Sequence, residues 1–162
     1  MYIKQVSDKN QIKTIEELAY EIWPEHYTPI IGKSQVEYML EKFQSVKAMT
    51  EQMKNGYCYF LSEHDNVPVG YMSVNINLDT LFLSKFYVVS TERGKGYGKN
   101  MIAYLETLAK EKSLKKIALT VNKHNTGSIK MYEKVGFVIC GTAVKDIGEG
   151  FVMDDYRMEK RV

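Results

Sequence analysis

The sequence predicts a mixed α/β fold, in which a mostly antiparallel sheet of about six or seven strands is flanked by about four or five helices. Three observations support this prediction. Short apolar runs rich in β-branched and aromatic residues, such as 81–89 (LFLSKFYVV), recur along the chain. Between them, apolar residues recur three and four positions apart, which is the period of an amphipathic helix. Turn-forming residues separate the two kinds of segment.

The N-terminal part of the chain predicts one short strand and three helices. The strand covers 2–6, and the first helix ends near Pro24, because proline has no N–H to continue the helix. Ser34 followed by Glu37 is a capping-box pattern, which predicts the start of a second helix. A third, short helix is expected over 47–54. The inward faces of the first two helices hold Ile12, Ile15, Ala19 and Ile22, then Val36, Met39, Leu40 and Phe43.

The remaining segments complete the sheet. Asp65-Asn66 predicts a hairpin turn, and Gly148–Gly150 predicts the turn of a closing strand pair. Strands are expected at 57–63, 69–77, 81–89, 116–121, 137–145 and 151–160. A helix after Gly98 has Met101, Ile102, Leu105, Leu108 and Ala109 on one face. Parallel strands need a crossover connection, so parallel pairing is expected only across this helix.

Length and composition are those of an ordinary globular protein, and we interpret residues 1–162 as a single domain. Hydrophobic residues make up 44% of the chain and charged residues 26%. A net charge of +2 does not favour binding to nucleic acid or to a membrane surface. No apolar stretch approaches the roughly 18 residues of a membrane span, and the N-terminus lacks the apolar core of a signal peptide. We therefore expect a cytoplasmic protein.

Cysteine and histidine usage adds two expectations. Cys58 and Cys140 both fall in expected strands, where we expect buried, reduced thiols rather than a disulfide. The three histidines are scattered without the spacing of metal ligands, so no metal site is expected.

The most informative segment is 93–98 (RGKGYG), which lies between an expected strand and an expected helix. The first N–H groups of a helix have no partner within it, and the helix dipole places positive charge at the same end. Glycines let the backbone approach a ligand closely, and Arg93, Lys95 and Lys99 add positive charge. These features predict a phosphate or diphosphate site.

Two common phosphate motifs do not fit this segment. A dinucleotide fingerprint starting at Gly94 would need glycine at position 99, which is lysine, and a Walker A loop would need Ser or Thr at position 100, which is asparagine. The failed Walker match also weakens an interpretation as a nucleotide hydrolase. The spacing that fits is Arg-x-x-Gly-x-Gly at Arg93, Gly96 and Gly98, and it resembles the acetyl-CoA loop of the GNAT superfamily of N-acetyltransferases.

A second segment, 125–137, resembles the other signature of that superfamily, Asn-x-x-Ala-x-x-x-Tyr-x-x-x-Gly-Phe, with Ser128 in place of the usual alanine. Asn125 is a good helix N-cap, and Gly136 is suited to end the helix. The resemblance covers roughly residues 68–140 well and implies the GNAT fold. It implies transfer of an acetyl group from acetyl-CoA to a primary amine in a ternary complex.

The resemblance also implies roles for individual residues. Tyr132 stands where the family commonly has a tyrosine near the coenzyme A sulfur, and would act as the general acid. The coenzyme would be held by Phe86, Val88, Arg93, Gly94, Lys95, Gly96, Tyr97, Gly98, Lys99, Asn125, Ser128 and Lys134. In this set the backbone N–H groups of Phe86 and Val88 would stabilise the oxyanion. The amine acceptor would be bound by Trp23, Glu25, His26, Tyr27 and Asp154.

Several alternatives stay open at this stage. The acceptor is a small amine or a peptide amine, and the N-terminal half looks somewhat like small bacterial members that act on diamines or polyamines. Candidates for the general base are Glu25, His26, Glu63, Asp79, Asp154 and Asp155. A homodimer is common in the family. A different function, a non-catalytic module that binds or senses acyl-CoA, would retain the loop without needing a thiolate acid.

Overall fold

The structure, a computed structural model, describes residues 1–162 and divides them into two compact units. The first unit comprises Met1–Asn75 and Lys85–Met101, and the second comprises Ile76–Ser84 and Ile102–Val162. Strand β4 (Thr80–Val88) and helix α4 (Tyr97–Glu111) contribute residues to both units. The interpretation of the chain as a single domain stays a prediction.

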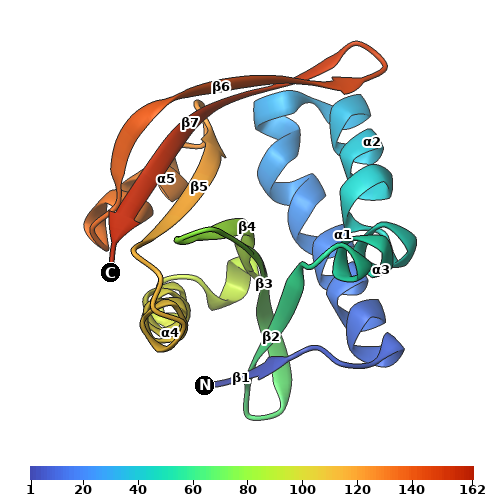
Figure 1. The fold of residues 1–162 in the computed structure, drawn as a ribbon. Coiled ribbons are helices and arrows are strands. Elements are labelled where there is room, and N and C mark those ends of the chain that lie inside the picture. The colour runs from blue at the N-terminus through green and yellow to red at the C-terminus, as the bar shows by residue number, and fades with distance from the viewer. The chain divides into compact units, whose positions relative to one another are not determined.

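The first unit begins with strand β1 (Tyr2–Gln5) and three helices that pack on one another, α1 (Lys9–Ile31), α2 (Lys33–Gln44) and α3 (Val46–Lys54) (Figure 1). Strands β2 (Cys58–His64) and β3 (Val67–Asn77) follow as an antiparallel hairpin, and β1 pairs antiparallel with β2. Asp65 and Asn66 have φ values of 50° and 64°, the conformation of a tight hairpin turn, which confirms the predicted turn.

Helix α1 is longer than the sequence predicts, because it continues through Pro24 and Pro29 to Ile31. A proline inside a helix removes one backbone hydrogen bond and clashes with the preceding turn, at a cost of about 3 kcal/mol. The apolar face of α1 continues to Ile22 and Trp23, both of which are buried. Burial of these two large side chains contributes about 1.5–3 kcal/mol each and offsets the cost at Pro24. The prediction that the helix ends near Pro24 is therefore wrong.

The predicted capping box at Ser34 and Glu37 is also wrong. Helix α2 begins at Lys33, one residue before Ser34, and its N-cap is Gly32, which has no side chain to accept a hydrogen bond. A capping box is present instead at the start of α1, where Asp8 accepts from the Gln11 N–H and the Gln11 side chain accepts from the Asp8 N–H. The predicted apolar positions Val36, Met39 and Leu40 are buried, and Phe43 is partly buried.

A close approach of two backbones fixes the end of β4 in the first unit. The Val89 N–H donates to the Val69 carbonyl at 2.9 Å. At Gly70, a Cβ atom would lie only 2.4 Å from the carbonyl oxygen of Tyr87, so no larger residue fits without movement of the backbone. Gly70 therefore allows β3 to lie against the segment that leads into the glycine-rich loop.

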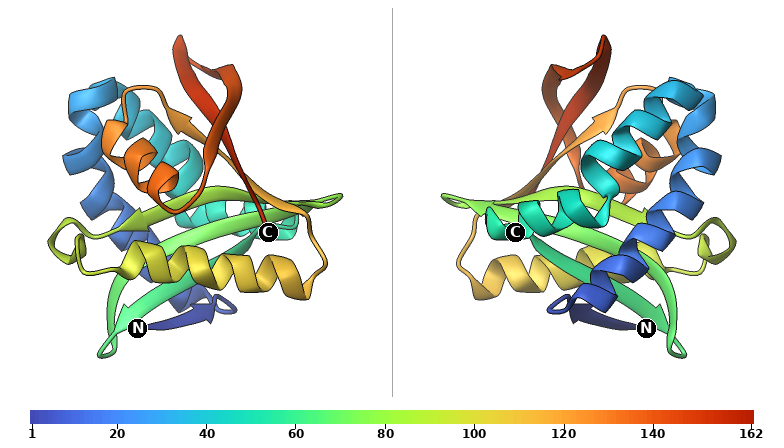
Figure 2. Two further views of the ribbon diagram at one scale, coloured as in Figure 1. Left: turned by 90° about the vertical axis from the view of Figure 1, so that its left-hand side faces the viewer. Right: turned by 90° about the vertical axis from the view of Figure 1, so that its right-hand side faces the viewer.

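The second unit contains β5 (Lys116–Asn122), α5 (Thr126–Lys134), β6 (Val138–Gly148) and β7 (Phe151–Arg161). Strand β5 pairs parallel with residues 80–83 of β4 and antiparallel with β7, and β6 and β7 form a long hairpin (Figure 2). The chain crosses between the two parallel strands through α4, as predicted. The seven strands have the order β1-β2-β3-β4-β5-β7-β6, and five α-helices accompany them, which confirms the predicted fold class.

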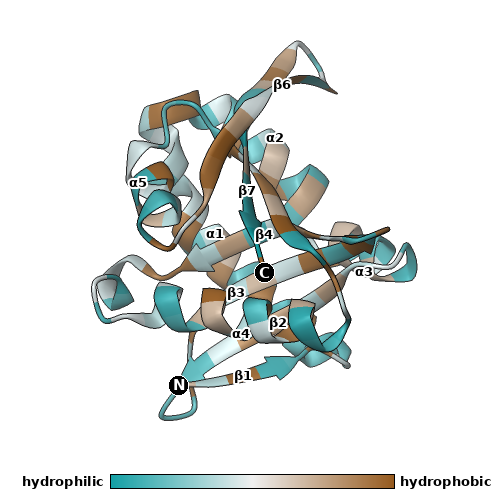
Figure 3. Ribbon diagram, turned by 60° about the vertical axis from the view of Figure 1, so that its left-hand side comes forward, coloured by the Kyte–Doolittle hydropathy of each residue, from teal (hydrophilic) through white to brown (hydrophobic).

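Strand β6 is one edge of the sheet, and parts of its ribbon are coloured as hydrophobic in Figure 3. It carries exposed apolar side chains, Val138, Ile139 and Val144. Exposed edge strands can pair with further chains, and this surface is compatible with a homodimer, which stays a prediction. Both cysteines are free; Cys58 is partly buried, but Cys140 on β6 is exposed, so the expectation that both are buried is wrong for Cys140. None of the helices combines the length and the apolar character that a transmembrane span requires.

Candidate active site

The glycine-rich loop connects the end of β4 to α4 through a short 3₁₀ turn, Ser90–Glu92. Gly94 and Gly96 have φ values of 79° and 87°, which lie in the left-handed region that favours glycine. An added Cβ at either position would meet no atom within 4 Å, so the constraint is the backbone conformation and not the available space. The loop therefore presents backbone with an open surface in front of it.

The N-terminus of α4 supplies unpaired N–H donors at this loop. Helix α4 begins at Tyr97, and the first hydrogen bond of its ladder runs from the Asn100 N–H to the Gly96 carbonyl at 3.1 Å. The N–H groups of Tyr97, Gly98 and Lys99 therefore have no acceptor within the helix. These donors, together with the positive end of the helix dipole, form an anion site. Gly98 lies near the Phe86 ring, since a Cβ atom added to this glycine would lie 3.8 Å from the ring.

The cations of the loop are partly engaged by the protein itself, which was not predicted. The Arg93 Nε donates to the Val88 carbonyl at 3.0 Å and so ties the loop to the end of β4. Lys95 Nζ lies 2.9 Å from Glu92 Oε2, and its hydrogen bond to that carboxylate raises the pKa of Lys95. Arg93 is thus a structural anchor of the loop as well as a source of charge. The side chains of Arg93 and Lys95 are both exposed to solvent.

An aromatic cluster lies in the first unit, between the end of α1 and strands β3 and β4. It consists of Trp23, Tyr27, Tyr71 and Tyr87. The Trp23 and Tyr27 ring centroids are 4.3 Å apart, and the Tyr71 and Tyr87 centroids are 5.3 Å apart. The Tyr27 and Tyr87 hydroxyl oxygens are 3.4 Å apart. Trp23 and Tyr27 were predicted from the sequence, whereas the two tyrosines on the strands were missed because an isolated tyrosine in a strand is usually core.

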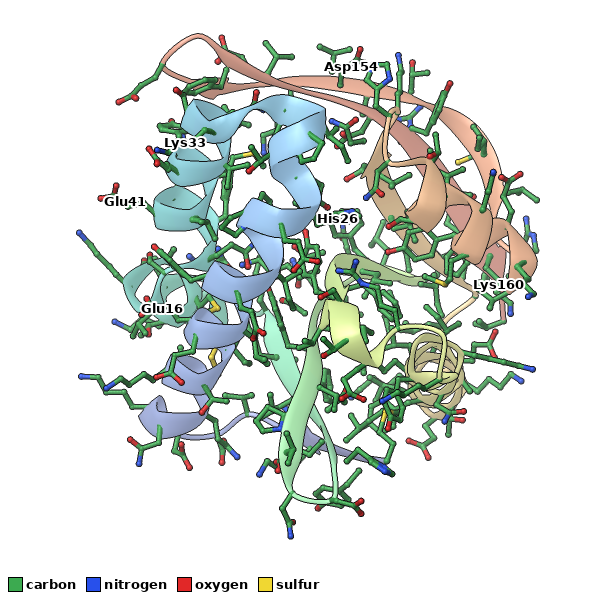
Figure 4. All side chains as sticks on the ribbon, turned by 180° about the vertical axis from the view of Figure 1, so that it is seen from behind. Glu16, His26, Lys33, Glu41, Asp154 and Lys160 are labelled. Carbon is green, nitrogen blue, oxygen red and sulfur yellow. The ribbon has the colours of Figure 1, made fainter.

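The other predicted acceptor residues of α1 lie beside this cluster. The His26 ring packs edge-on against Tyr27, with centroids 4.8 Å apart (Figure 4). Glu25 Oε2 accepts a hydrogen bond from the Ser90 hydroxyl at 3.2 Å, at the beginning of the turn that leads into the loop. The four predicted residues within 23–27 therefore share one end of α1, close to the end of β4. Asp154, the fifth predicted residue, belongs to the second unit.

A buried lysine in β4 was not anticipated. Lys85 is 6% exposed, and its Nζ donates to the Phe43 carbonyl, to Gln52 Oε1 at 3.1 Å and to Tyr59 Oη at 2.6 Å. Burial lowers the pKa of Lys85 to about 7, and burial of Tyr59 raises the pKa of its phenol. Lys85 thus links α2, α3 and β2 to β4, two residues before Tyr87. The sequence around Lys85 predicts only that alternate residues of the strand face the same side of the sheet; nothing in it predicts that the lysine is buried.

In the second unit, Tyr132 lies on the buried face of α5 and is 7% exposed. Its ring packs against Phe137, with centroids 5.5 Å apart. Asn125 occupies the N-cap position of α5 as predicted, but its side chain makes no capping hydrogen bond and is buried. Gly136 has a φ of 104° just after the helix end, as predicted for a C-terminal glycine. Ser128 is partly buried and Lys134 is exposed.

Two neighbouring carboxyl groups on β7 have different environments. Asp154 is exposed and forms an ion pair with Lys123 at 2.9 Å (Figure 4). Asp155 is 5% exposed. Burial, and secondarily the charge of Asp154, raise the pKa of Asp155 to about 6, against a hydrogen bond from Thr120 and the charge of Lys123, which lower it.

These features fit a diphosphate-containing coenzyme at the loop. Gly94 and Gly96 give a backbone that a diphosphate can approach, the first turn of α4 gives N–H donors, and Arg93 and Lys95 give positive charge nearby. The arrangement can bind a doubly charged anion through main-chain donors. The individual coenzyme, acceptor and catalytic residues named from the sequence stay predictions.

Comparison with known proteins gives consistent results. Residues 13–137 match the acetyltransferase (GNAT) family. An N-acetyltransferase of Bacillus subtilis, YycN, which is uncharacterized, is 38% identical over 56 residues; the match spans 35% of this chain and 36% of that relative.

Two solved structures have the same fold. The PaiA N-acetyltransferase from Thermoplasma acidophilum, in complex with coenzyme A, has a TM-score of 0.81 at 21% identity, with full coverage of both chains. A GCN5-related N-acetyltransferase from Rhodopseudomonas palustris has a TM-score of 0.83 at 14% identity and covers 99% of this chain and 95% of its own. The family match covers most of the sequence and includes both motifs found in it. The chain therefore belongs to the acetyltransferase (GNAT) family, as its sequence motifs predict.

Proposed function

We propose that the protein transfers an acetyl group from acetyl-CoA directly to a primary amine while both are bound. The observation that carries this proposal is the loop at 93–99, where two left-handed glycines precede the unpaired N–H groups of α4. Family membership supports the reaction type. The solved relative that contains coenzyme A supports the choice of coenzyme.

The loop would hold the diphosphate of the coenzyme. Hydrogen bonds to charged groups contribute about 1.5–3 kcal/mol each, so three or four main-chain donors could supply much of the affinity. Asn125, Ser128 and Lys134 would complete the coenzyme site, on the strength of the second motif. When bound, acetyl-CoA supplies an activated thioester. The N–H groups of Phe86 and Val88 would stabilise the negative charge that develops on its carbonyl oxygen, an effect worth about 2.7–4 kcal/mol per donor.

Tyr132 would be the general acid. A phenol with an ordinary pKa near 10 retains its proton at neutral pH and can give it to a departing thiolate. Its position in the second motif supports this assignment, and the competing interpretation is a core tyrosine on the buried face of α5. A non-catalytic binding module would have no use for such a group.

The acceptor would be a cationic amine. Glu25 and the aromatic cluster Trp23, Tyr27, Tyr71 and Tyr87 lie together at the end of α1 and β4. Carboxylates attract an ammonium group, and aromatic faces bind cations and alkyl chains. This environment favours a diamine or polyamine over a neutral acceptor, and a peptide N-terminus is the competing acceptor in the experiment below. The cytoplasmic location and the homodimer belong to the same proposal.

The proposal is tested by measuring thiol release from acetyl-CoA with a panel of putrescine, spermidine, lysine and short peptides. We expect release that depends on the amine, with the polyamines as the better substrates. Tight binding of acetyl-CoA without release on any amine would instead identify a binding or sensing module. Thiol release with peptides alone would support acetyl transfer as the reaction and would contradict a polyamine as the acceptor.

A further inference from the structure

A side-chain hydrogen bond joins the acceptor residues of α1 to the segment that leads into the glycine-rich loop, and it runs from Ser90 to Glu25. We propose that Ser90 is a positioning residue, whose hydroxyl group holds the Glu25 carboxylate at the start of this loop so that the carboxylate binds the acceptor ammonium there. Both residues and the loop at 93–99 belong to the first unit. The inference rests on the proposed acetyl transfer and adds to it a residue that neither sequence motif contains.

The backbone on both sides of Ser90 is fixed by hydrogen bonds. The Val89 N–H donates to the Val69 carbonyl at 2.9 Å, and the Arg93 N–H donates to the Ser90 carbonyl at 3.3 Å. The Glu92 N–H donates to the Val89 carbonyl at 2.9 Å and closes the 3₁₀ turn. Ser90 therefore presents its hydroxyl group from a defined position, three residues before the loop begins.

The Ser90 hydroxyl group does not contribute to this backbone structure. The 3₁₀ turn at 90–92 has no capping hydrogen bond from a side chain. The hydroxyl group instead donates to Glu25 Oε2 at 3.2 Å. Because the hydrogen bonds of the turn join main-chain atoms, they should persist when the hydroxyl group is removed. An effect of its removal on acceptor binding can therefore be separated from an effect on the loop.

The charge of the Glu25 carboxylate is not neutralised by the protein. None of the ion pairs in the structure includes Glu25. The surrounding helix offers no candidate, since residues 14–32 contain neither lysine nor arginine. A hydroxyl donor leaves the negative charge in place, and an ionised carboxylate has two oxygens that accept hydrogen bonds. Glu25 can therefore bind an ammonium group while Ser90 holds it.

The cations that follow Ser90 in the sequence have other partners. Arg93 Nε donates to the Val88 carbonyl at 3.0 Å. Lys95 Nζ lies 2.9 Å from Glu92 Oε2 and forms an ion pair with it. The loop thus leaves the Glu25 carboxylate available to a cation from outside the protein, although the hydrogen bond to Ser90 places this carboxylate next to the loop.

A second contact joins the same two segments. The Tyr27 and Tyr87 hydroxyl oxygens are 3.4 Å apart, and their rings meet edge-on with centroids 6.2 Å apart. Glu25 precedes Tyr27 by two residues on α1, and Ser90 follows Tyr87 by three residues after β4. Both tyrosines are only partly buried. A cationic amine bound at this junction would therefore find a carboxylate and aromatic rings supplied by the same two segments.

The hydrogen bond from Ser90 also orders a mobile type of side chain. Glu25 is exposed, and a glutamate side chain loses rotamer freedom when its carboxylate is held in one place. Ser90 imposes part of this loss before the acceptor binds, so binding of the ammonium costs less conformational entropy. Removal of the Ser90 hydroxyl group should consequently weaken acceptor binding more than it changes the chemical step.

The test compares Ser90→Ala with the wild type and with Thr91→Ala, which removes an exposed hydroxyl group from the same turn. The varied acceptor is spermidine, or the best peptide if peptides alone release thiol. We expect Ser90→Ala to raise the KM for the acceptor about 3- to 10-fold, the size expected for one hydrogen bond. The kcat, and the affinity for acetyl-CoA measured by calorimetry, should stay close to the wild-type values. Ser90→Thr retains a hydroxyl group and should retain the wild-type KM.

A double-mutant cycle tests whether Ser90 acts through Glu25. Glu25→Gln removes the charge but keeps an oxygen that accepts from Ser90, and it should raise the KM for the acceptor at least as much as Ser90→Ala. Adding Ser90→Ala to Glu25→Gln should then raise this KM less than about twofold, because the two residues form one interaction.

Three results would overturn the role of Ser90. They are a KM in Ser90→Ala equal to that in Thr91→Ala, a full effect of Ser90→Ala in the Glu25→Gln background, and a loss of acetyl-CoA affinity in Ser90→Ala without a change in the KM for the acceptor. The last result would make Ser90 a residue that shapes the loop alone. If the wild type released no thiol with any amine, the proposed function itself would fail.

Discussion

Tyr132→Phe is expected to lower kcat about 10²- to 10⁴-fold, the usual contribution of a general acid, while the affinity for acetyl-CoA changes little. The substitution removes only the hydroxyl group. The ring, which packs against Phe137 on the buried face of α5, is retained, so the fold and the second motif should be preserved. Stopped-flow thiol release with a saturating amine measures kcat, and calorimetry measures the affinity for acetyl-CoA.

A chemical control sharpens this prediction. A thioester with a more acidic thiol as leaving group needs less help from an acid, so the defect of Tyr132→Phe should be smaller with such a substrate. Equal turnover of Tyr132→Phe and wild type on acetyl-CoA would remove the acid role. An equal loss of affinity and turnover would make Tyr132 a binding residue instead.

Lys85→Met is expected to abolish an increase of stability with pH that the wild type shows between about pH 7 and pH 10. Burial lowers the pKa of Lys85 from 10.5 to about 7 in the folded protein. Across this window the unfolded chain holds a proton at Lys85 that the folded chain has released, so the free energy of unfolding rises with pH. A pKa shift of this size raises the free energy of unfolding by about 4–5 kcal/mol over the whole pH window. Above pH 10 the raised pKa of Tyr59 opposes a further increase in the free energy of unfolding. In that range the Tyr59 phenol ionises in the unfolded chain but keeps its proton in the folded chain.

The neighbours of Lys85 make methionine a clean substitution. Without the ammonium group, Gln52 Nε2 still donates to the Phe43 carbonyl at 3.1 Å, and the Tyr59 hydroxyl still donates to Gln52 Oε1. No buried partner is left without a hydrogen bond, so the loss of the pH dependence is not confounded by an orphaned group. Urea unfolding across neutral to alkaline pH measures the effect, with the exposed Lys47→Met as control. A wild-type stability that is flat over this range would contradict the assignment.

The fold was predictable from the sequence because its signals are local and agree with one another. The strands are apolar runs of strand length, the Asp65-Asn66 turn has residue types that tolerate positive φ, and the glycine loop follows a buried strand. One error arose where burial in the folded protein overrides a local rule, since Pro24 is inside α1 and the neighbouring Ile22 and Trp23 are buried there. The other error lies at α2, which begins after Gly32 and not at the Ser34 pattern.

The candidate site was predictable where a motif carries it and not where burial decides it. The loop at 93–98 and the motif around Tyr132 have fixed spacings in the sequence. No such spacing marks Lys85, Tyr71 or Asp155, because their environment depends on which face of the strand is covered in the folded protein. For Asp155 it also depends on the ion pair that Lys123 forms with the neighbouring Asp154. The ion pair between Lys95 and Glu92 lies in the turn before α4 and not in a helix, so a helical ion-pair spacing does not predict it.

The central claim is that the backbone of the loop binds the diphosphate of coenzyme A, and calorimetry of acetyl-CoA with the wild type and with Gly96→Val tests it most directly. Gly96 has a φ of 87°, which a β-branched residue adopts only with strain, so valine should displace the N–H groups that precede and begin α4. We expect measurable binding to the wild type and affinity at least about tenfold weaker in the variant, corresponding to the loss of one hydrogen bond to a charged group. No heat of binding with the wild type, or equal affinities for the two proteins, would contradict the account.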